Sequence, residues 1–477
     1  NATAISANPT IVGMFDYWLA GTGGSFTQMF VLVTSDGRVF KEDMDGTFDD
    51  ITGTATIGAN TMPVFCQARD LLTIWFSDNS TPLRYNQTGN VATLGGSPPA
   101  GRGACYHVNR VWTWGANANP NRLTYSSSTS VEDYTGADTG TIDIEPEDGD
   151  RIIACVPHKN RIIVFKGPNK GSIHQLAGTA PTGSDAFSRT LLTRGLPLQS
   201  PNGWTEVGDD IWFQTERGIH SLAATEKFGN FTSADLTFNR PGNGWFLNRI
   251  NRARMNRSWG VHYANKNCVV FTMASSGNGW ENRALCLSYI DPARGLQPSL
   301  WLRTCASAAI RVNPSTLARE VVFGDRAGRV LRQDVRDRNI ETSTAYTMRL
   351  RTPQILLGQQ DAAGRPRVDL PVSLQRAYLK SQSVGNYDVT LRLKRDENAA
   401  ESYTFNQAVS GFLLGTSVLG TGVLGDNNLQ TVSVELAGEA RAVEVELIQG
   451  GLDQDANLYE LSITAVPSSD VGASTLA

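Results

Sequence analysis

Residues 122–176 read RLTYSSSTSVEDYTGADTGTIDIEPEDGDRIIACVPHKNRIIVFKGPNKGSIHQL and contain three short apolar runs separated by polar turns. The runs are Ile152–Val156, Ile162–Phe165 and Ser172–Leu176. The polar turn His158-Lys159-Asn160 joins the first two, and a Gly-rich loop leads to the third. Short β-branched or aromatic runs bounded by Asn, Gly and Pro are typical of strands. The stretch therefore predicts an antiparallel meander.

The same order of strand, polar turn, apolar strand, loop and short strand recurs along residues 1–334. Seven copies align on the centre of their second strand, at Val31, Ile74, Trp112, Ile163, Trp212, Val270 and Val322. Their mean spacing is about 48 residues, within the range of a four-stranded propeller blade. One blade cannot bury both of its faces, but blades packed in a closed ring can. We therefore predict an all-β fold that begins with a β-propeller of about seven blades, with six as the alternative count. Unrelated hairpins in a β-sandwich are the competing interpretation.

The composition fits many short strands better than helices, because charged residues make up only 18% of the 477 residues and glycine is frequent. The formal net charge of −4 argues against a protein that grips DNA phosphates, which carries a basic excess. The sequence has neither a long unbroken apolar run nor a signal-peptide pattern, so we predict no membrane segment.

Six cysteines lie far apart without a CxxC pair, mostly in apolar strands. This pattern favours reduced, buried cysteines and folding in a reducing cytoplasm. They are Cys66, Cys105, Cys155, Cys268, Cys286 and Cys305.

The composition of the sequence changes after residue 334, where a short charged segment and a polar stretch precede a second set of predicted strands. Segments such as Leu391–Lys394 and Val443–Leu447 alternate between apolar and polar residues, so one face of each strand should contact water. We predict a C-terminal β-sandwich over residues 335–470, a usual size for a domain. Residues 471–477 are predicted to fray.

A Leu-Gly-rich segment, residues 411–425, interrupts these strands with a repeat that matches neither helix nor strand. One interpretation is a loop folded over its own sandwich. The other is an apolar arm that contacts a neighbouring subunit, because exposed apolar segments mark interfaces. The candidate contact residues are Phe412, Leu414, Leu419 and Leu424.

The sequence gives no positive support for catalysis. The five histidines (His107, His158, His174, His220 and His262) form no HxH or HExxH spacing, and we interpret them as structural. The acidic run from Asp143 to Asp150 lacks the spacing of a calcium loop and is better explained as a turn into the next blade. Asp-box repeats, a Gly-x-Ser-x-Gly elbow and a phosphate loop are absent from the sequence. We therefore predict a protein that is not an enzyme and needs no metal or cofactor.

Several segments of the propeller resemble a known family. They are Arg122–Ser126, Glu132-Asp133-Tyr134, Gly140 with Ile142–Ile144, Asp148-Gly149-Asp150, and Asn160–Lys166. Together they are similar to bacteriophage tail hub proteins, above all the nozzle, or packaged-DNA stabilisation, proteins of short-tailed phages. The Leu-Gly segment also resembles C-terminal segments of phage virion proteins.

This resemblance implies a structural virion protein: a six-subunit ring below the portal and head-to-tail adaptor that continues the DNA channel. Such a ring retains the genome and supports tail fibres or spikes, while DNA passes through its lumen without specific binding. The protein would be made in the host bacterial cytoplasm and reside in the virion tail. The resemblance brings no catalytic residues. The alternative function is a tail-tip propeller that binds a host-surface glycan, and a weaker one is a propeller hydrolase.

Overall fold

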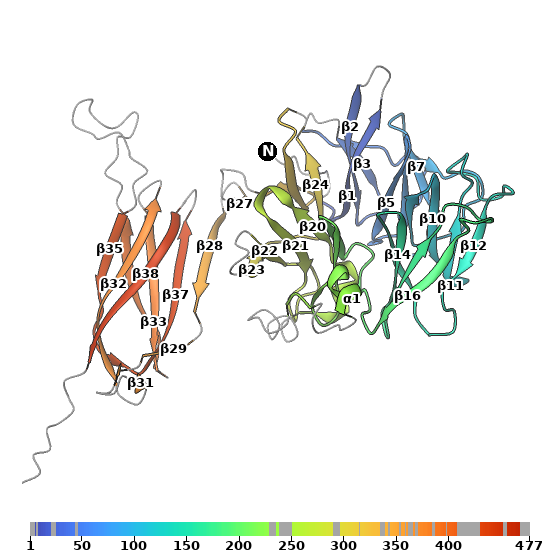
Figure 1. Ribbon diagram of the computed structural model, residues 1–477. Helices are drawn as coiled ribbons and strands as arrows, with labels where there is room; N and C mark the ends of the chain where they lie inside the picture. Colours follow the sequence, from blue (N-terminus) through green and yellow to red (C-terminus); the bar gives the residue numbers. More distant parts are fainter. Residues whose placement is uncertain are drawn as a thin grey trace, which may run out of the picture. The chain divides into compact units, whose positions relative to one another are not determined.

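The computed structural model describes residues 5, 8–20, 25–42, 46–228, 235–237, 250–289, 296–313, 315–333, 339–341, 344–352, 354–357, 359–360, 366–367, 371–383, 387–396, 398–407, 430–451 and 456–467. The chain divides into two compact units, Asn1–Gln333 and Asp334–Ala477, and the boundary expected from the sequence falls one residue from this division. Each unit is built almost entirely of antiparallel strands (Figure 1).

Unit 1 is a β-propeller of seven small sheets, in agreement with the predicted fold and blade count. Blades 1 to 3 consist of β1 (Ile11–Ala20), β2 (Phe26–Thr34), β3 (Val39–Glu42) and β4 (Asp49–Asp50); β5 (Pro63–Ala68), β6 (Leu71–Phe76), β7 (Leu83–Tyr85) and β8 (Ala92–Thr93); and β9 (Gly103–His107), β10 (Arg110–Ala116), β11 (Asn119–Tyr125) and β12 (Gly140–Asp143). Blade 4 consists of β13 (Arg151–His158), β14 (Arg161–Gly167), β15 (Ser172–Ala177) and β16 (Ser188–Arg194).

Blades 5 to 7 continue the series, with three described strands in the fifth and seventh sheets. They consist of β17 (Trp204–Val207), β18 (Asp210–Gln214) and β19 (Ile219–Ser221); β20 (Gly260–Tyr263), β21 (Cys268–Met273), β22 (Arg283–Ser288) and β23 (Gln297–Leu302); and β24 (Ser307–Val312), β25 (Arg319–Gly324) and β26 (Val330–Arg332). The helix α1 (Leu222–Phe228) follows β19, and two short 3₁₀ turns, Arg252–Arg257 and Ala264–Lys266, flank β20.

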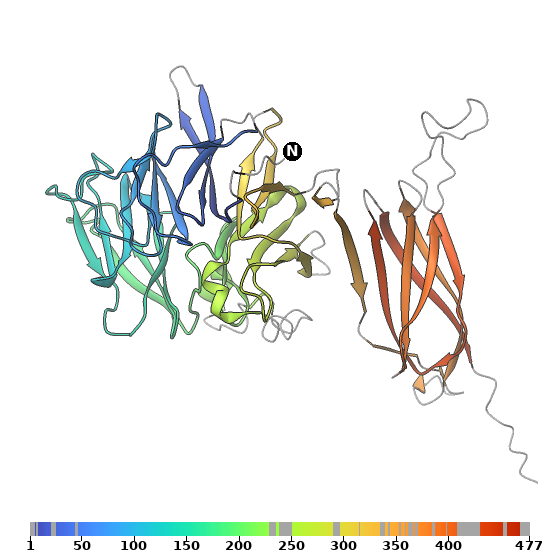
Figure 2. The same cartoon turned by 180° about the vertical axis from the view of Figure 1, so that it is seen from behind.

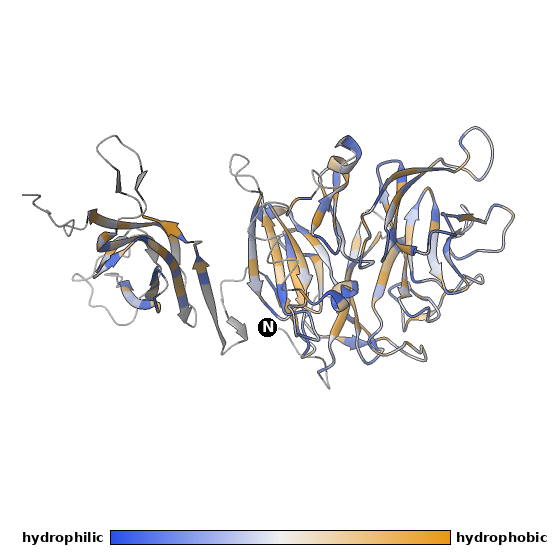
Figure 3. Cartoon of the chain, turned by 90° about the horizontal axis from the view of Figure 1, so that it is seen from below, coloured by the Kyte–Doolittle hydropathy of each residue, from blue (hydrophilic) through white to orange (hydrophobic). Residues whose placement is uncertain are grey.

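The second strand of every blade is buried where the sequence placed its centre, and the seven predicted centres all lie in β2, β6, β10, β14, β18, β21 and β25. These strands carry large apolar side chains on both faces because each blade packs between two neighbours. Hydrophobic residues accordingly follow the strands of the propeller in Figure 3. Burial of this apolar surface is the main force that holds the blades together.

The ring is closed by contacts between its first and last blades. The Ser307 hydroxyl donates a hydrogen bond of 2.8 Å to the Ile11 carbonyl, and the Ile11 amide donates one of 3.0 Å to the Asp325 carbonyl. Between blades 4 and 5 the rings of Phe165 and Phe213 lie 5.0 Å apart. The described first strands of the other neighbouring blades lie against one another around the axis.

Contacts also cross the axis of the propeller. The side-chain amide of Asn202, at the entrance to blade 5, donates a 3.0 Å hydrogen bond to the carbonyl of Pro63 in blade 2. The Arg257 guanidinium, before blade 6, donates to the Asn60 carbonyl before blade 2. Met62 packs in the same apolar cluster as Trp259. Blade 2 is three places from blade 5 in the ring, so these contacts fill the axis at the end where the first strands begin.

Unit 2 is a β-sandwich, as predicted. One sheet contains β27 (Asn339–Glu341), β28 (Thr344–Arg351), β29 (Ile355–Leu356), β37 (Ala442–Gly451), β33 (Tyr387–Arg395) and β34 (Glu401–Gln407); the other contains β35 (Gln430–Glu435), β32 (Val372–Ser383), β36 (Glu439–Ala440) and β38 (Ala456–Pro467). A separate pair is formed by β30 (Gln359–Gln360) and β31 (Pro366–Arg367). The two sheets face each other in the ribbon (Figure 2). Buried residues of both sheets, such as Leu379 and Leu391, belong to one apolar cluster.

Candidate functional site

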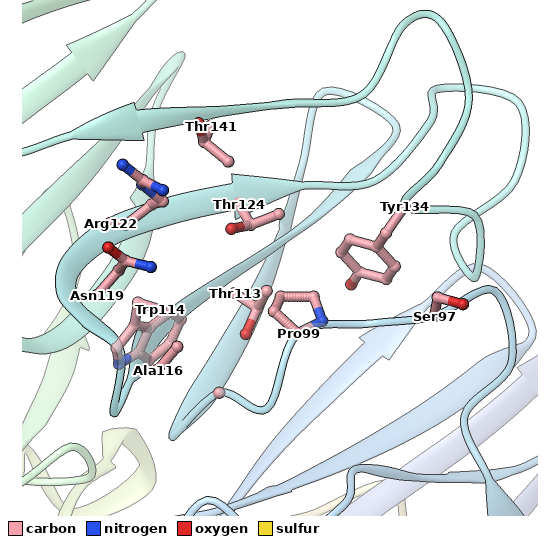
Figure 4. A pocket seen from close by; sticks show the side chains of 11 residues that line it. Ser97, Pro99, Thr113, Trp114, Ala116, Asn119, Arg122, Thr124, Tyr134 and Thr141 are labelled. Atoms are coloured by element: carbon pink, nitrogen blue, oxygen red, sulfur yellow. The ribbon is translucent and has the colours of Figure 1, made fainter.

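A pocket of about 310 Å³ lies on the face of blade 3. It is lined by Ser97, Pro99, Gly101, Thr113, Trp114, Ala116, Asn119, Arg122, Thr124, Tyr134 and Thr141. These residues come from the segment between β8 and β9, from β10, β11 and β12, and from the loop 126–139 that joins β11 to β12 (Figure 4). The volume is near the lower end of the range for small-molecule sites, about 300–1,000 Å³.

Three threonines form the floor of the pocket. Thr113 pairs with Thr124, and Thr124 pairs with Thr141, so all three side chains project from the same face of adjacent strands. Figure 4 shows them in a row across β10, β11 and β12. Apolar residues such as Leu123 alternate with them and face blade 4 instead. Strand alternation therefore gives blade 3 one apolar face and one hydroxyl-rich face.

An ion pair closes one side of this floor. Arg122 donates two hydrogen bonds to Asp143, of 2.7 and 2.9 Å, from the neighbouring position on β12. The bond to the guanidinium holds the pKa of the Asp143 carboxyl below its usual value, and the same bond raises the pKa of Arg122. The two charges therefore compensate each other at the rim.

The loop 126–139 covers the pocket and is held by contacts to both sides. On the blade 2 side, Arg84 donates to Glu132 at 3.0 Å, and the guanidinium of Arg69 donates to two carbonyls of the loop. On the blade 3 side, the buried guanidinium of Arg110 donates to the carbonyls of Ser126 (2.8 Å) and Asp138 (2.6 Å). These charge-assisted bonds fix the loop before any ligand arrives.

Gly96 is needed for the close approach of this loop. Its φ of +69° lies in the left-handed region, and the Tyr134 amide donates to its carbonyl at 3.2 Å. A Cβ at this position would lie 1.7 Å from the carbonyl oxygen of Glu132. Only glycine lets the two backbones meet.

Tyr134 is the buried polar group of the site. Its side chain is 9% exposed, and its hydroxyl has no hydrogen-bond partner in the described part of the chain. Figure 4 shows the hydroxyl directed toward Pro99 and Thr113, into the pocket. Burial raises the pKa of Tyr134 well above its usual value, so the phenol keeps its proton.

The pocket was not predicted from the sequence. The alternation of Arg122 and Thr124 on one face of β11 was a signal for its polar floor. Nothing in the sequence indicated that Ser97, Pro99 and Gly101, from the segment between β8 and β9, would complete the lining. The predicted contact residues Phe412, Leu414, Leu419 and Leu424, with the segment 411–425, lie outside the described residues. Their role stays a prediction.

The acidic run Asp143–Asp150 joins blade 3 to blade 4, as the turn interpretation expected, and a lysine ammonium occupies its centre. Lys166 is 0% exposed, and its Nζ donates to the carbonyls of Ile144 (2.9 Å) and Glu145 (2.8 Å) and to the carboxylate of Asp148 (2.6 Å). The carboxylate of Asp150 accepts hydrogen bonds from three backbone amides of the 169–171 turn. The positive charge that an ion would bring is thus supplied by the chain.

The five histidines lie in β9, β13, β15, β19 and β20, on four blades. His174 contacts Ser172 at 3.0 Å, and His262 contacts the Tyr289 hydroxyl at 2.7 Å. Burial lowers the pKa of His174 to about 4 and also lowers the pKa of His107, His220 and His262. Within the described ranges, no group of three or more His, Cys, Asp or Glu side chains is arranged to hold a metal ion.

All six cysteines are free and buried, which confirms their predicted state. Cys66, Cys105 and Cys155 lie on the first strands of three successive blades. Burial raises the pKa of each of these thiols, so they remain protonated and act as small apolar side chains. In the part of the chain that the structure describes, there is also no helix with the length and apolarity to cross a membrane.

No family model matches the chain, and no curated protein matches it either. Among solved structures, YCF48 bound to a D1 peptide is 12% identical, with a TM-score of 0.40, over 70% of this chain and 94% of that chain. BamB from Moraxella catarrhalis is 11% identical, with a TM-score of 0.37, over 69% of this chain and 98% of that chain. An exo-β-1,3-galactanase from Phanerochaete chrysosporium, solved with galactose, is 10% identical, with a TM-score of 0.29, over 96% of this chain and 100% of that chain. These likenesses carry no function to this chain.

Proposed function

We propose that this protein is a non-enzymatic structural subunit of a bacteriophage tail, which forms the nozzle ring below the portal and adaptor. The proposal comes from the resemblance of residues 122–166 to tail nozzle proteins. The structural observation that supports it is the set of contacts across the axis of the propeller. Propellers are commonly built around a central channel, whereas here Asn202 and Pro63 are hydrogen-bonded across it.

Backbone and side chains that are hydrogen-bonded across the axis leave no path for DNA through one subunit. In the proposed ring, the DNA therefore runs through a lumen formed between copies. Identical subunits in such a ring need heterologous contacts, in which two different surfaces of each copy meet. The formal charge of −4 disfavours tight binding to phosphates, which suits a channel that releases the genome.

The lining of the blade 3 pocket differs from that of a glycoside-hydrolase site. Glycoside hydrolysis needs a pair of carboxylic acids on either side of the scissile bond. The described residues that line the pocket offer hydroxyls, one amide and one arginine instead. Asp143, the nearest carboxylate on the same strands, is engaged by Arg122 at 2.7 Å.

Native mass spectrometry of the purified full chain tests the ring. We expect a closed oligomer of six copies, the number that the resemblance implies. A stable monomer over the whole concentration range, together with absence of the chain from purified phage particles, would rule the proposal out.

The segment 411–425 offers a variant for the same measurement. If its apolar residues contact a neighbouring subunit, replacing Leu414, Leu419 and Leu424 by serine shifts the ring toward monomers. Replacing three exposed polar residues of unit 2, such as Gln375, by serine is the matched control and leaves the ring intact. An unchanged ring in the leucine variant would count against a subunit contact by this segment.

A further inference from the structure

The blade 3 pocket presents polar groups that the protein itself does not satisfy. The Tyr134 hydroxyl is buried and has no partner in the described part of the chain, although buried hydroxyls nearly always form a hydrogen bond. Leaving such a group unpaired destabilises the protein, so its position in a pocket points to a ligand that completes the bond.

Other groups of the pocket are available as well. Within the described residues, the side chains of Thr124, Thr141 and Asn119 form no hydrogen bond. They lie on β11 and β12, at the floor and rim of the same pocket. Hydroxyl and amide groups both donate and accept, so together they suit a ligand with several hydroxyls.

The charge of the pocket disfavours an ionic ligand. Arg122 is the one charged residue among those that line it, and its guanidinium is already bonded to Asp143 by two hydrogen bonds. A phosphate or carboxylate would have to displace this pair, and a cationic ligand would find no free carboxylate in the described lining. The ligand should therefore be neutral.

An apolar wall limits the shape of the ligand. The Pro99 ring forms an apolar wall beside Thr113 (Figure 4). The side chain of Trp114 projects from the opposite face of β10, where its indole N–H donates to the Ile153 carbonyl of blade 4. Because the loop 126–139 is pinned by Arg84 and Arg110, the pocket is preformed and binding costs little ordering of the chain. A compact ring with one apolar face and hydroxyls at its edge matches this arrangement.

We propose that the pocket binds a neutral saccharide of one or two rings. Hydroxyls of the sugar bond to Tyr134, Thr124 and Thr141, while its C–H face packs against Pro99. The site lies on one propeller and involves no second copy of the chain. It therefore stands or fails independently of the proposed ring.

The test uses the purified full chain and a panel of methyl glycosides of glucose, galactose, mannose and N-acetylglucosamine. Binding is detected by saturation-transfer NMR and measured by isothermal titration calorimetry, with adenosine and uridine as neutral ligands of another class. We expect at least one sugar to bind, and the Tyr134→Phe variant to bind it about tenfold more weakly, the effect of losing one hydrogen bond.

A second variant covers the case in which Tyr134→Phe alters the loop. Thr141 is the exposed end of the threonine floor on β12, so Thr141→Trp fills the pocket and should abolish binding without unfolding the blade. Thr190→Val, at an exposed position of β16 in blade 4, is the matched control and should bind like the unaltered protein. The proposal is overturned if none of the four sugars binds, or if only the nucleosides bind. It is also overturned if Tyr134→Phe and Thr141→Trp both bind the sugar with the affinity of the unaltered protein.

Discussion

Replacement of Lys166 by methionine should destabilise the propeller far more than loss of a surface charge. Lys166 is 0% exposed, and its ammonium is held by two carbonyls and by Asp148, 2.6 Å away. Methionine keeps most of the apolar stem, so packing changes little while the charge is lost. The Asp148 carboxylate, whose side chain is only 13% exposed, is then left without its cation.

The expected magnitude follows from this burial. Removing one partner of a buried ion pair costs about 3–5 kcal/mol, because the remaining charge stays desolvated. A whole domain is stable by only about 5–15 kcal/mol. The matched control is Arg194→Met, which breaks a pair of 2.7 Å with Glu145 on the same acidic run. Since the Arg194 side chain is 57% exposed, that loss should be at most about 1 kcal/mol.

Urea unfolding followed by tryptophan fluorescence measures this difference. All ten tryptophans lie between residues 18 and 301, so the signal reports on the propeller alone. The shift of the midpoint, multiplied by a common slope, gives the change in free energy of unfolding. Adding Asp148→Asn to the Lys166 variant removes the stranded charge and should restore part of the stability.

The reasoning is refuted if Lys166→Met shifts the midpoint no more than Arg194→Met does. It is also refuted if adding Asp148→Asn lowers the stability of the Lys166→Met variant further instead of restoring part of it. Either outcome would show that the ammonium contributes little to the acidic run.

Three further predictions use the same unfolding assay. Gly96→Ala should lower the free energy of unfolding by more than about 1 kcal/mol, because φ is +69° and the new Cβ meets the Glu132 carbonyl. Gly149→Ala, in open space at φ +80°, should lower it less. Equal losses in the two variants would contradict the close approach at Gly96. Burial holds the pKa of His174 at about 4, below the usual 6.5, so the unfolded chain binds a proton at a higher pH than the folded protein does. The stability of the propeller should therefore fall as the pH drops from 6.5 to 4. His174→Gln should reduce that fall, and an unchanged pH profile in this variant would contradict the role of His174. Asn202→Leu removes the hydrogen bond across the axis and should cost about 1 kcal/mol, and a stabilised variant would contradict the role of that bond.

The blade repeat was readable from the sequence because second strands such as Ile162–Phe165 are buried on both faces. A run of consecutive apolar residues marks such a strand without knowledge of its neighbours. In unit 2 the alternating segment Leu391–Lys394 lies within the strand Tyr387–Arg395, since strict alternation identifies a half-buried strand.

Other elements could not be predicted. The sequence did not single out the strand Glu401–Gln407, because Phe405 is the one fully buried residue among the positions of this strand whose burial is described. The helix Leu222–Phe228 follows a blade strand where a further strand was as plausible from the sequence.

The site residues escaped prediction because their role depends on distant contacts. Tyr134 becomes a buried hydroxyl only when Arg84 and Arg110 fix its loop from two blades. Lys166 did carry a signal, as the single charged residue that ends an apolar strand near an acidic run. The sequence pattern alone does not tell whether such a lysine reaches water or turns inward.

Electron cryomicroscopy of the assembled full chain tests the proposed role most directly. We expect a closed ring of copies whose lumen lies between subunits, with Asn202 hydrogen-bonded to Pro63 across the axis of each propeller. Isolated single subunits, or DNA density running through the axis of one propeller, would contradict it.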